Sequence, residues 1–282
     1  MSTQPTPYDG SAAPFTIGLK PLDLAEWLQR DDTFDLQLAD KRRRYAEMPS
    51  KVFVEQPDTR AAQGEVLALF EDHLGTKAPA SDAAPLIRAS LLVQEDLILM
   101  RRGEDGWRLA AGSLCFPSSW TLTEKFGLPL HEIHAPVPGF GAGTRNHELI
   151  HRMFDRLHQP VMRWNWSVQA GGALYHPLSN EGRDERATAR SRRFGIDDVK
   201  AAAFIRVERQ TLRRLPESGD ILFTIRIYLD PLGWIARHGD RAQIAPAFAQ
   251  QLMQLDAAQL DYKGLTADRD LLVAALGEIA RS

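Results

Sequence analysis

The pattern of apolar and polar positions divides the chain into helical ends and a strand-rich centre. Up to about residue 80, apolar residues recur at three- and four-residue spacings, as in "PLDLAEWLQRDD", which is typical of amphipathic helices. From residue 86 the apolar positions form short alternating or continuous runs. Two such runs, "LIRASLLVQEDLILMRR" and "WRLAAGSLCF", are separated by the turn "GEDG". They predict an antiparallel pair of strands.

The second half of the chain predicts short helices, then three strands, and then helices again. Short helices and tight loops lead to a predicted helix over about residues 145–158, which stops before Pro160. "VMRWNWSVQ" predicts a strand, and "AAFIRVERQTLRRLP" and "DILFTIRIYLDPL" predict two paired strands joined by the turn "ESGD". The segment "NEGRDERATARSRRFG", which lies between the strand "VMRWNWSVQ" and the first of these paired strands, predicts a charged, exposed loop. From about residue 241 the pattern is helical again.

This order of elements predicts an α+β protein with a central antiparallel sheet. A strand pair, a helical middle and three further strands is also the order of a PAS-type fold, in which the helical segment covers one face of a small sheet and shapes a pocket. We therefore expect a disordered tail over 1–14, a helical extension over 15–80, a PAS-like core over 85–235 and helices over 240–282, all packed as one unit.

Composition and charge narrow the class of protein. The 282 residues include 44% apolar and 25% charged residues, with a net charge of -3. Such a chain has no general attraction to nucleic acid or to anionic membranes, so we expect neither as a partner. The chain starts without a signal-peptide pattern and has no apolar run near the roughly 20 residues of a membrane span. We expect a cytoplasmic protein. Its single cysteine, Cys115, fits a buried apolar thiol better than a haem thiolate ligand.

The stretch "HELIH", His147 to His151, matches the H-E-x-x-H pattern of zinc hydrolases. A catalytic zinc ion needs three protein ligands. The extended form of the motif requires glycine and histidine where this chain has Phe154 and Leu157. The zinc hydrolase is therefore a remote alternative.

Four other stretches carry candidate chemistry. In "HEIHAPVPG", the rigid Pro-Val-Pro after His134 would aim an imidazole at a metal or haem iron, although a structural histidine fits equally well. In the predicted strand "RWNWS", Trp164 and Trp166 share one face, which is either core or a wall for a planar ligand. In "RVERQTLRRLP", alternating charged residues are either exposed or meet anionic groups such as haem propionates. The basic cluster "KRRRY" predicts a solvated helix face or an anion contact.

Several segments together resemble one bacterial family, the haem-dependent oxidative N-demethylases, first described as domain of unknown function 3445. They appear in the family's order from about residue 90 to 230, and they are "QEDLILM", "CFPSSW", "IHAPVPG", "RWNW", "RVERQTLRRLP" and "FTIRIY". The resemblance implies a PAS-like alpha-type subunit that binds haem b. It would use O2 to oxidise a methyl group of a small secondary amine, such as dimethylamine, and release formaldehyde. A non-enzymatic PAS-like sensor of haem or a small ligand is the alternative.

The resemblance also implies partners and roles. Electrons would come from NADPH through a separate reductase carrying flavin and iron-sulfur groups, because this chain has neither cluster cysteines nor a G-x-G-x-x-G fingerprint. His134 is the first choice for axial iron ligand and His151 the second. Glu208 and Asn165 are the catalytic candidates; Glu208 would hold a cationic amine or neutralise an arginine. The implied cofactor-binding residues are Arg163, Trp166, Arg206, Arg209 and Arg213.

Overall fold

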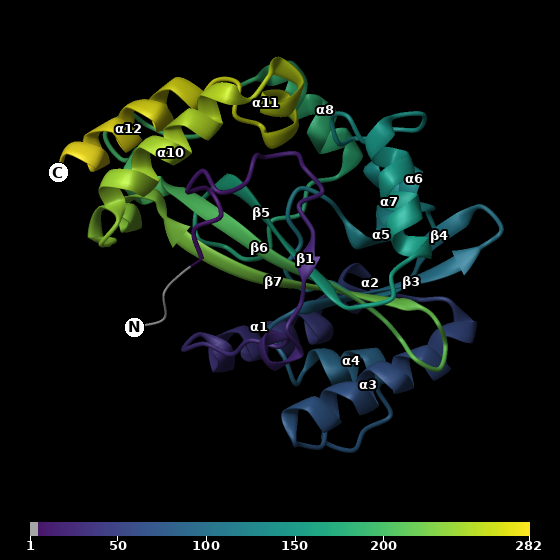
Figure 1. Ribbon diagram of the computed structural model, residues 1–282. Helices are drawn as coiled ribbons and strands as arrows, with labels where there is room; N and C mark the ends of the chain where they lie inside the picture. The colour runs from purple at the N-terminus through teal and green to yellow at the C-terminus, as the bar shows by residue number, and fades with distance from the viewer. Residues whose placement is uncertain (1–4) are drawn as a thin grey trace.

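The computed structural model describes residues 5–282, and their centre is one antiparallel sheet (Figure 1). Its strands are β1 (Lys20–Pro21), β2 (Phe53–Glu55), β3 (Asp96–Gly103), β4 (Gly106–Ser113), β5 (Val161–Ala170), β6 (Ala203–Arg214) and β7 (Ile221–Pro231). They lie in the order β1-β5-β6-β7-β3-β4-β2, and every neighbouring pair is antiparallel. The last long strand, β7, lies beside the first, β3, which joins the two halves of the sheet.

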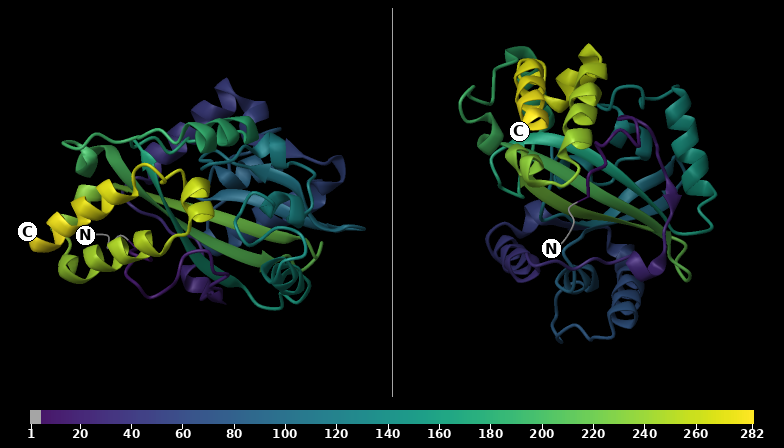
Figure 2. Two further views of the ribbon diagram at one scale, coloured as in Figure 1. Left: turned by 90° about the horizontal axis from the view of Figure 1, so that it is seen from above. Right: turned by 60° about the vertical axis from the view of Figure 1, so that its left-hand side comes forward.

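Helices surround this sheet on several sides. They are α1 (Phe34–Glu47), α2 (Pro49–Val52), α3 (Arg60–Leu74), α4 (Pro85–Ser90), α5 (Leu122–Lys125), α6 (Leu130–His134), α7 (Arg145–Asp155), α8 (Asn180–Ala189), α9 (Val199–Ala202), α10 (Arg241–Gln254), α11 (Ala257–Lys263) and α12 (Arg269–Arg281), with short 3₁₀ helices at Leu24–Glu26, Pro57–Thr59 and Leu232–Arg237. In Figure 2, the N-terminal helices, the C-terminal helices and α7 occupy three separate sides of the sheet. None of the helices within residues 5–282 is long and apolar enough to cross a membrane.

The predicted α+β class is confirmed. The strand pair β3–β4, the short helices α5 to α7 and the strands β5 to β7 follow one another as the sequence predicts. The β3–β4 turn depends on Gly106, whose φ of 98° is a conformation that side-chain-bearing residues rarely adopt. The comparison with a PAS-type fold stays a prediction.

Alternate residues of the strands point to opposite faces of the sheet, and this places three apolar clusters. Ile98 and Met100 on β3 pack with the middle helices α5 to α7. Leu97 and Leu99 point the other way, toward the N-terminal helices. By the strand register, Trp166 on β5 lies on the same face of the sheet as Leu97 and Leu99. It packs with the C-terminal helices, where its ring contacts Phe248. The face that carries Ile98 and Met100 is left to the middle segment of the chain.

The N-terminal part departs from the prediction in two ways. The predicted helical extension over 15–80 also supplies β1 and β2, which pair with β5 and β4 at the two edges of the sheet. The predicted disordered tail is wrong at Tyr8, which is 2% exposed and lies 4.6 Å, between ring centroids, from Phe248. Burying one aromatic side chain fixes this segment against α10. Residues 1–4 of the predicted tail fall outside the described residues.

The two predicted charged surfaces also differ from the structure. The predicted loop after Ser179 is the helix α8, and the Ser179 side chain accepts a hydrogen bond from the backbone N–H of Gly182 at its N-terminus. In "KRRRY", Lys41 is fully buried. Its ammonium donates hydrogen bonds to the carbonyl oxygens of Ser90, Val93 and Glu95. Neither interpretation of that basic cluster applies to Lys41, because its partners are backbone carbonyls inside the protein.

Candidate functional site

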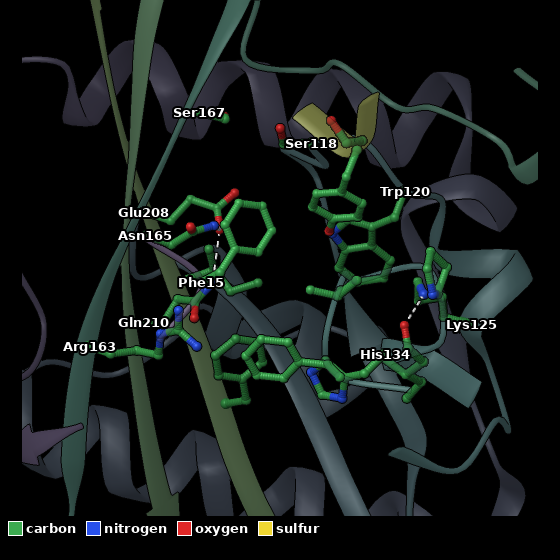
Figure 3. Close-up of a pocket in the computed structure, with 18 of the residues that line it drawn as sticks. Phe15, Ser118, Trp120, Lys125, His134, Arg163, Asn165, Ser167, Glu208 and Gln210 are labelled. Carbon is green, nitrogen blue, oxygen red and sulfur yellow. Dashed lines mark hydrogen bonds between the residues drawn. The ribbon is translucent and has the colours of Figure 1, made fainter. Parts of the chain in front are cut away.

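A cavity of about 280 Å³ lies between the sheet and the middle segment of the chain (Figure 3). One part of its lining is apolar: Ile98, Met100, Leu109, Leu130, Ile133, Val137, Phe140, Ile150, Met153, Phe154, Leu212, Phe223 and Ile225. The other part is polar and rich in cations: Ser118, Lys125, Arg163, Asn165, His176, Arg183, Arg186, Arg193, Glu208, Gln210, Tyr262 and Lys263. The cavity therefore suits a ligand with an apolar body and anionic substituents.

His134 lines this cavity at the end of α6. The helix begins after Pro129, whose fixed φ suits a helix start, and it stops at His134 because Pro136 follows. The Nδ1 atom of His134 lies 2.9 Å from the carbonyl oxygen of Leu130. A carbonyl oxygen can only accept, so Nδ1 carries the proton and Nε2 keeps its lone pair.

The electrostatic setting keeps this imidazole neutral. Burial lowers the pKa of His134 to about 4, and the nearby charges of Lys125 and Arg163 act in the same direction. A neutral imidazole with one nitrogen anchored and the other free is the form that ligates metal ions. His134 is thus the sequence candidate that the structure best equips as a ligand.

The strand wall of the cavity is built by alternate residues of β5 and β6. Asn165 pairs with Glu208, and Arg163 pairs with Gln210, in the register of the two strands. The Glu208 carboxylate accepts hydrogen bonds from Gln210 Nε2 at 2.8 Å and from Asn165 Nδ2 at 3.3 Å. Figure 3 shows these residues facing Trp120, Lys125 and His134 across the cavity. The two amides hold the carboxylate in place without neutralising it.

Arg163 is a partly buried cation with an unmatched hydrogen-bonding group. Its Nε has no partner among the described residues. Burial lowers the pKa of its guanidinium, and the charge of Glu208 acts against that shift. An arginine that faces a cavity in this state favours an anionic ligand.

The sequence analysis assigned no role to five further cations of the cavity: Lys125, Arg183, Arg186, Arg193 and Lys263. Arg183 and Arg186 lie one turn apart on α8, and Lys263 ends α11. Charge content predicted an exposed loop for Arg183 and Arg186. The spacing of three residues, together with Ser179 as a helix cap, is the feature that could have identified them as neighbours on one helix face.

Five of the predicted cofactor contacts do not line the cavity, and His151 and Trp166 are two of them. His151 sits on α7 beside the β3–β4 turn, where a Cβ atom added to Gly106 would lie 2.8 Å from its Cε1. The cavity-lining residues of that helix are Ile150, Met153 and Phe154. Trp166 points to the opposite face of the sheet, and its Nε1 donates to Gln251 on α10. Trp166 is therefore a core residue, the ordinary interpretation of the aromatic pair.

The three predicted β6 arginines also have structural partners. Arg209 donates to the carbonyl oxygens of Trp27 and Glu26, and the Arg213 guanidinium lies 4.4 Å from the centroid of a Trp27 ring. Arg206 is buried beyond the cavity lining, where it donates to the carbonyl oxygen of Phe116. Odd-numbered β6 residues face away from the cavity, and for this reason Arg209 and Arg213 do not line it.

The remaining sequence candidates are also located. Cys115 is buried, as predicted, and burial raises the pKa of its thiol to about 12. His147 and His151 are adjacent on α7, with ring centroids 4.6 Å apart. However, no three His, Cys, Asp or Glu side chains within residues 5–282 are arranged to hold a metal ion. The zinc interpretation of "HELIH" therefore has no third ligand.

Comparison with known families identifies the core of the chain. A family model described as haem-dependent oxidative N-demethylase, alpha subunit-like, matches residues 73–273. The matched part is well over half of the chain. It contains the strands β3 to β7 and every cavity-lining residue except Phe15, Ile17 and Leu19.

Proposed function

This chain belongs to the haem-dependent oxidative N-demethylase, alpha subunit-like family, and we propose that His134 is the axial ligand of a haem b bound in the cavity. The observation that carries the proposal is the Nδ1 to Leu130 hydrogen bond, because it leaves Nε2 of a neutral imidazole free to bind iron. The reaction we propose is the O2-dependent removal of a methyl group from a small secondary amine.

The cavity residues fit a haem group in two respects. Aliphatic and aromatic side chains, among them Leu109, Phe140 and Phe154, supply apolar contacts for the macrocycle. Arg163 and Lys125, whose charges both act on the His134 ring, are the cations we assign to the propionates. The unmatched Nε of Arg163 supports this assignment, since a propionate would supply its missing partner.

When bound, the haem supplies the O2 and electron-transfer chemistry that side chains lack. The overall reaction takes up O2, two electrons and two protons, and yields the demethylated amine, formaldehyde and water. Glu208 would bind the substrate ammonium and accept a proton from it, while Asn165 and Gln210 keep its carboxylate oriented. Glu208 also forms a salt bridge with Arg206, whose Nε lies 3.7 Å from Glu208 Oε1. The carboxylate is therefore shared between an arginine and the cavity.

Electrons would reach the site from a separate reductase subunit carrying flavin and iron-sulfur groups. The family description as an alpha subunit supports a partner. With one cysteine, this chain has too few thiolates to hold an iron-sulfur cluster with four cysteine ligands.

An absorption spectrum of the purified protein, before and after dithionite, tests haem binding. We expect a Soret band that is lost or strongly shifted in His134→Ala and unchanged in His151→Ala, because His151 lies outside the cavity. A colourless protein that takes up no haem on reconstitution would contradict the proposal. Amine-dependent O2 consumption and formaldehyde release with a competent reductase then separate an enzyme from a non-catalytic haem sensor.

A further inference from the structure

The polar part of the cavity holds more positive charge than its own carboxylate and a haem can balance. Arg183 and Arg186 both reach it from α8. Their hydrogen bonds go to neutral oxygens: Arg183 donates to Ser119 O at 2.6 Å and Asn180 Oδ1 at 3.1 Å, and Arg186 donates to Tyr262 O at 2.7 Å. Neither has an ion-pair partner among the described residues. Each also carries a buried Nε without any partner.

The neighbouring arginine on the same segment shows what a balanced cation looks like. Arg193 lines the same cavity, yet its Nε lies 3.2 Å from a carboxylate oxygen of the buried Asp268. The charges of Arg183 and Arg186 have no such counterpart. Burial, followed by the charges of Arg193 and Arg183, lowers the pKa of Arg186 to about 10.

Lys263 adds a further cation from α11. Its ammonium donates to the carbonyl oxygen of Trp166 at 2.6 Å and lies 5.0 Å from the centroid of the Phe15 ring. Burial lowers its pKa to about 8, and the charge of Glu208 opposes that shift. Within residues 5–282, Glu208 is the single carboxylate that lines the cavity.

A haem would bring two propionates, and Arg163 and Lys125 can match them. Arg183, Arg186 and Lys263 would then remain, and the carboxylate of the lining that could offset them, Glu208, also lies beside Arg206. Arg183 and Arg186 are partly buried and each has a buried Nε without a partner, so an anionic group that binds there stabilises the site. Dimethylamine or another simple alkylamine has no anionic group to offer.

We propose that the substrate is an N-methylamino carboxylate, whose carboxylate binds Arg183 and Arg186 while its ammonium faces Glu208. This rests on the proposed demethylase function and specifies its substrate class. The two ends of the site belong to one cavity, because Glu208, Tyr262, Arg183 and Arg186 all line it. Paired arginines bind a carboxylate with charge-assisted hydrogen bonds, which gives specificity that an apolar wall does not.

The test compares N-methylglycine with dimethylamine as ligands of the purified protein, by calorimetry and by changes in the haem spectrum. We expect N-methylglycine to bind at least about 10-fold more tightly, the size of one charge-assisted hydrogen bond. Arg186→Gln and Arg183→Gln should each weaken the binding of N-methylglycine by about 10-fold and change the binding of dimethylamine by less than about 2-fold. The matched control is Arg192→Gln, an exposed arginine of the same segment, which should change neither.

Haem content is measured in the same samples, so that a failure of the carboxylate proposal can be distinguished from a failure of the haem proposal. Equal binding of both amines, or equal weakening of both by Arg186→Gln, would overturn the carboxylate proposal and leave the haem proposal intact. Loss of haem in Arg183→Gln and Arg186→Gln would also overturn it, because these arginines would then hold the propionates. If the protein contains no haem, calorimetry still decides whether the arginines select the carboxylate.

Discussion

His134 and Leu130 are joined within one helical turn, with Nδ1 of the ring 2.9 Å from the Leu130 carbonyl oxygen. This contact assigns the ring proton to Nδ1 and fixes the orientation of the imidazole. Because burial lowers the pKa of His134 to about 4, the ring is neutral at physiological pH. Both properties have consequences that can be measured without any haem present.

The first prediction concerns stability against pH in haem-free protein. The unfolded chain protonates His134 near pH 6.5 and the folded chain only near pH 4, so falling pH favours unfolding between these values. Wild type should therefore lose about 1–3 kcal/mol relative to His134→Gln between pH 6.5 and 4, and nothing above pH 6.5. Urea unfolding of both proteins between pH 4 and pH 7.5 measures this difference.

Other groups in that pH range act in the opposite direction and cancel in the comparison. Burial raises the pKa of Asp96 and of Asp230 to about 6. As the pH falls, the folded protein protonates these two aspartates at a higher pH than the unfolded chain does. Their contribution to stability therefore decreases as the pH rises from about 3.8 to 6. Both residues are present in wild type and in His134→Gln. A difference between the two proteins that does not change with pH would show that His134 titrates normally.

Period-two alternation allowed much of the sheet and part of the site to be predicted from sequence. Arg163 and Asn165 face the cavity and Trp166 faces the core, as the alternation requires. The same rule separates Glu208 from Arg209 on β6, yet the motif match assigned both to the cofactor. A family motif includes residues that stabilise the fold as well as residues that bind the ligand, and the strand geometry determines which of them reach the cavity.

The missed residues depend on tertiary packing that no local pattern encodes. The α8 segment is polar on all sides and has no fully buried side chain, so its charge predicted a loop. Its contacts with Ser119 and Tyr262, far away in the sequence, hold Arg183 and Arg186 over the cavity. The burial of Lys41 likewise depends on carbonyl groups some fifty residues later in the chain.

The second prediction separates the β6 arginines from the haem site. Arg209→Met leaves the carbonyl oxygens of Trp27 and Glu26 without their buried donor. We expect the free energy of unfolding to fall by about 2–3 kcal/mol, with haem per protein unchanged. Arg213→Met removes only the stacking on Trp27 and should cost about 1 kcal/mol. Urea unfolding and the ratio of Soret to protein absorbance report the two quantities; haem loss at normal stability would restore Arg209 as a propionate ligand.

The third prediction concerns two adjacent residues of "KRRRY". Lys41→Met leaves three carbonyl oxygens and the Ser90 hydroxyl without their shared donor. The expected loss is about 3 kcal/mol in the free energy of unfolding. Arg42→Met, on the exposed side of the same helix, should change it by less than about 0.5 kcal/mol. Similar denaturation midpoints for the two variants would mean that the Lys41 hydrogen bonds do not contribute to stability.

The last prediction gives Arg163 opposite effects in the haem-free and haem-bound states. Without haem its desolvated guanidinium has no direct ion-pair partner among the described residues, so Arg163→Met should raise the free energy of unfolding by about 1 kcal/mol. With haem the same substitution removes the propionate partner and should weaken haem binding by about 10-fold. Thermal unfolding of haem-free protein and haem transfer to an acceptor protein measure the two effects. A variant that loses stability in both states would show that Arg163 supports the fold. Tighter haem binding in the variant would remove Arg163 from the cofactor site.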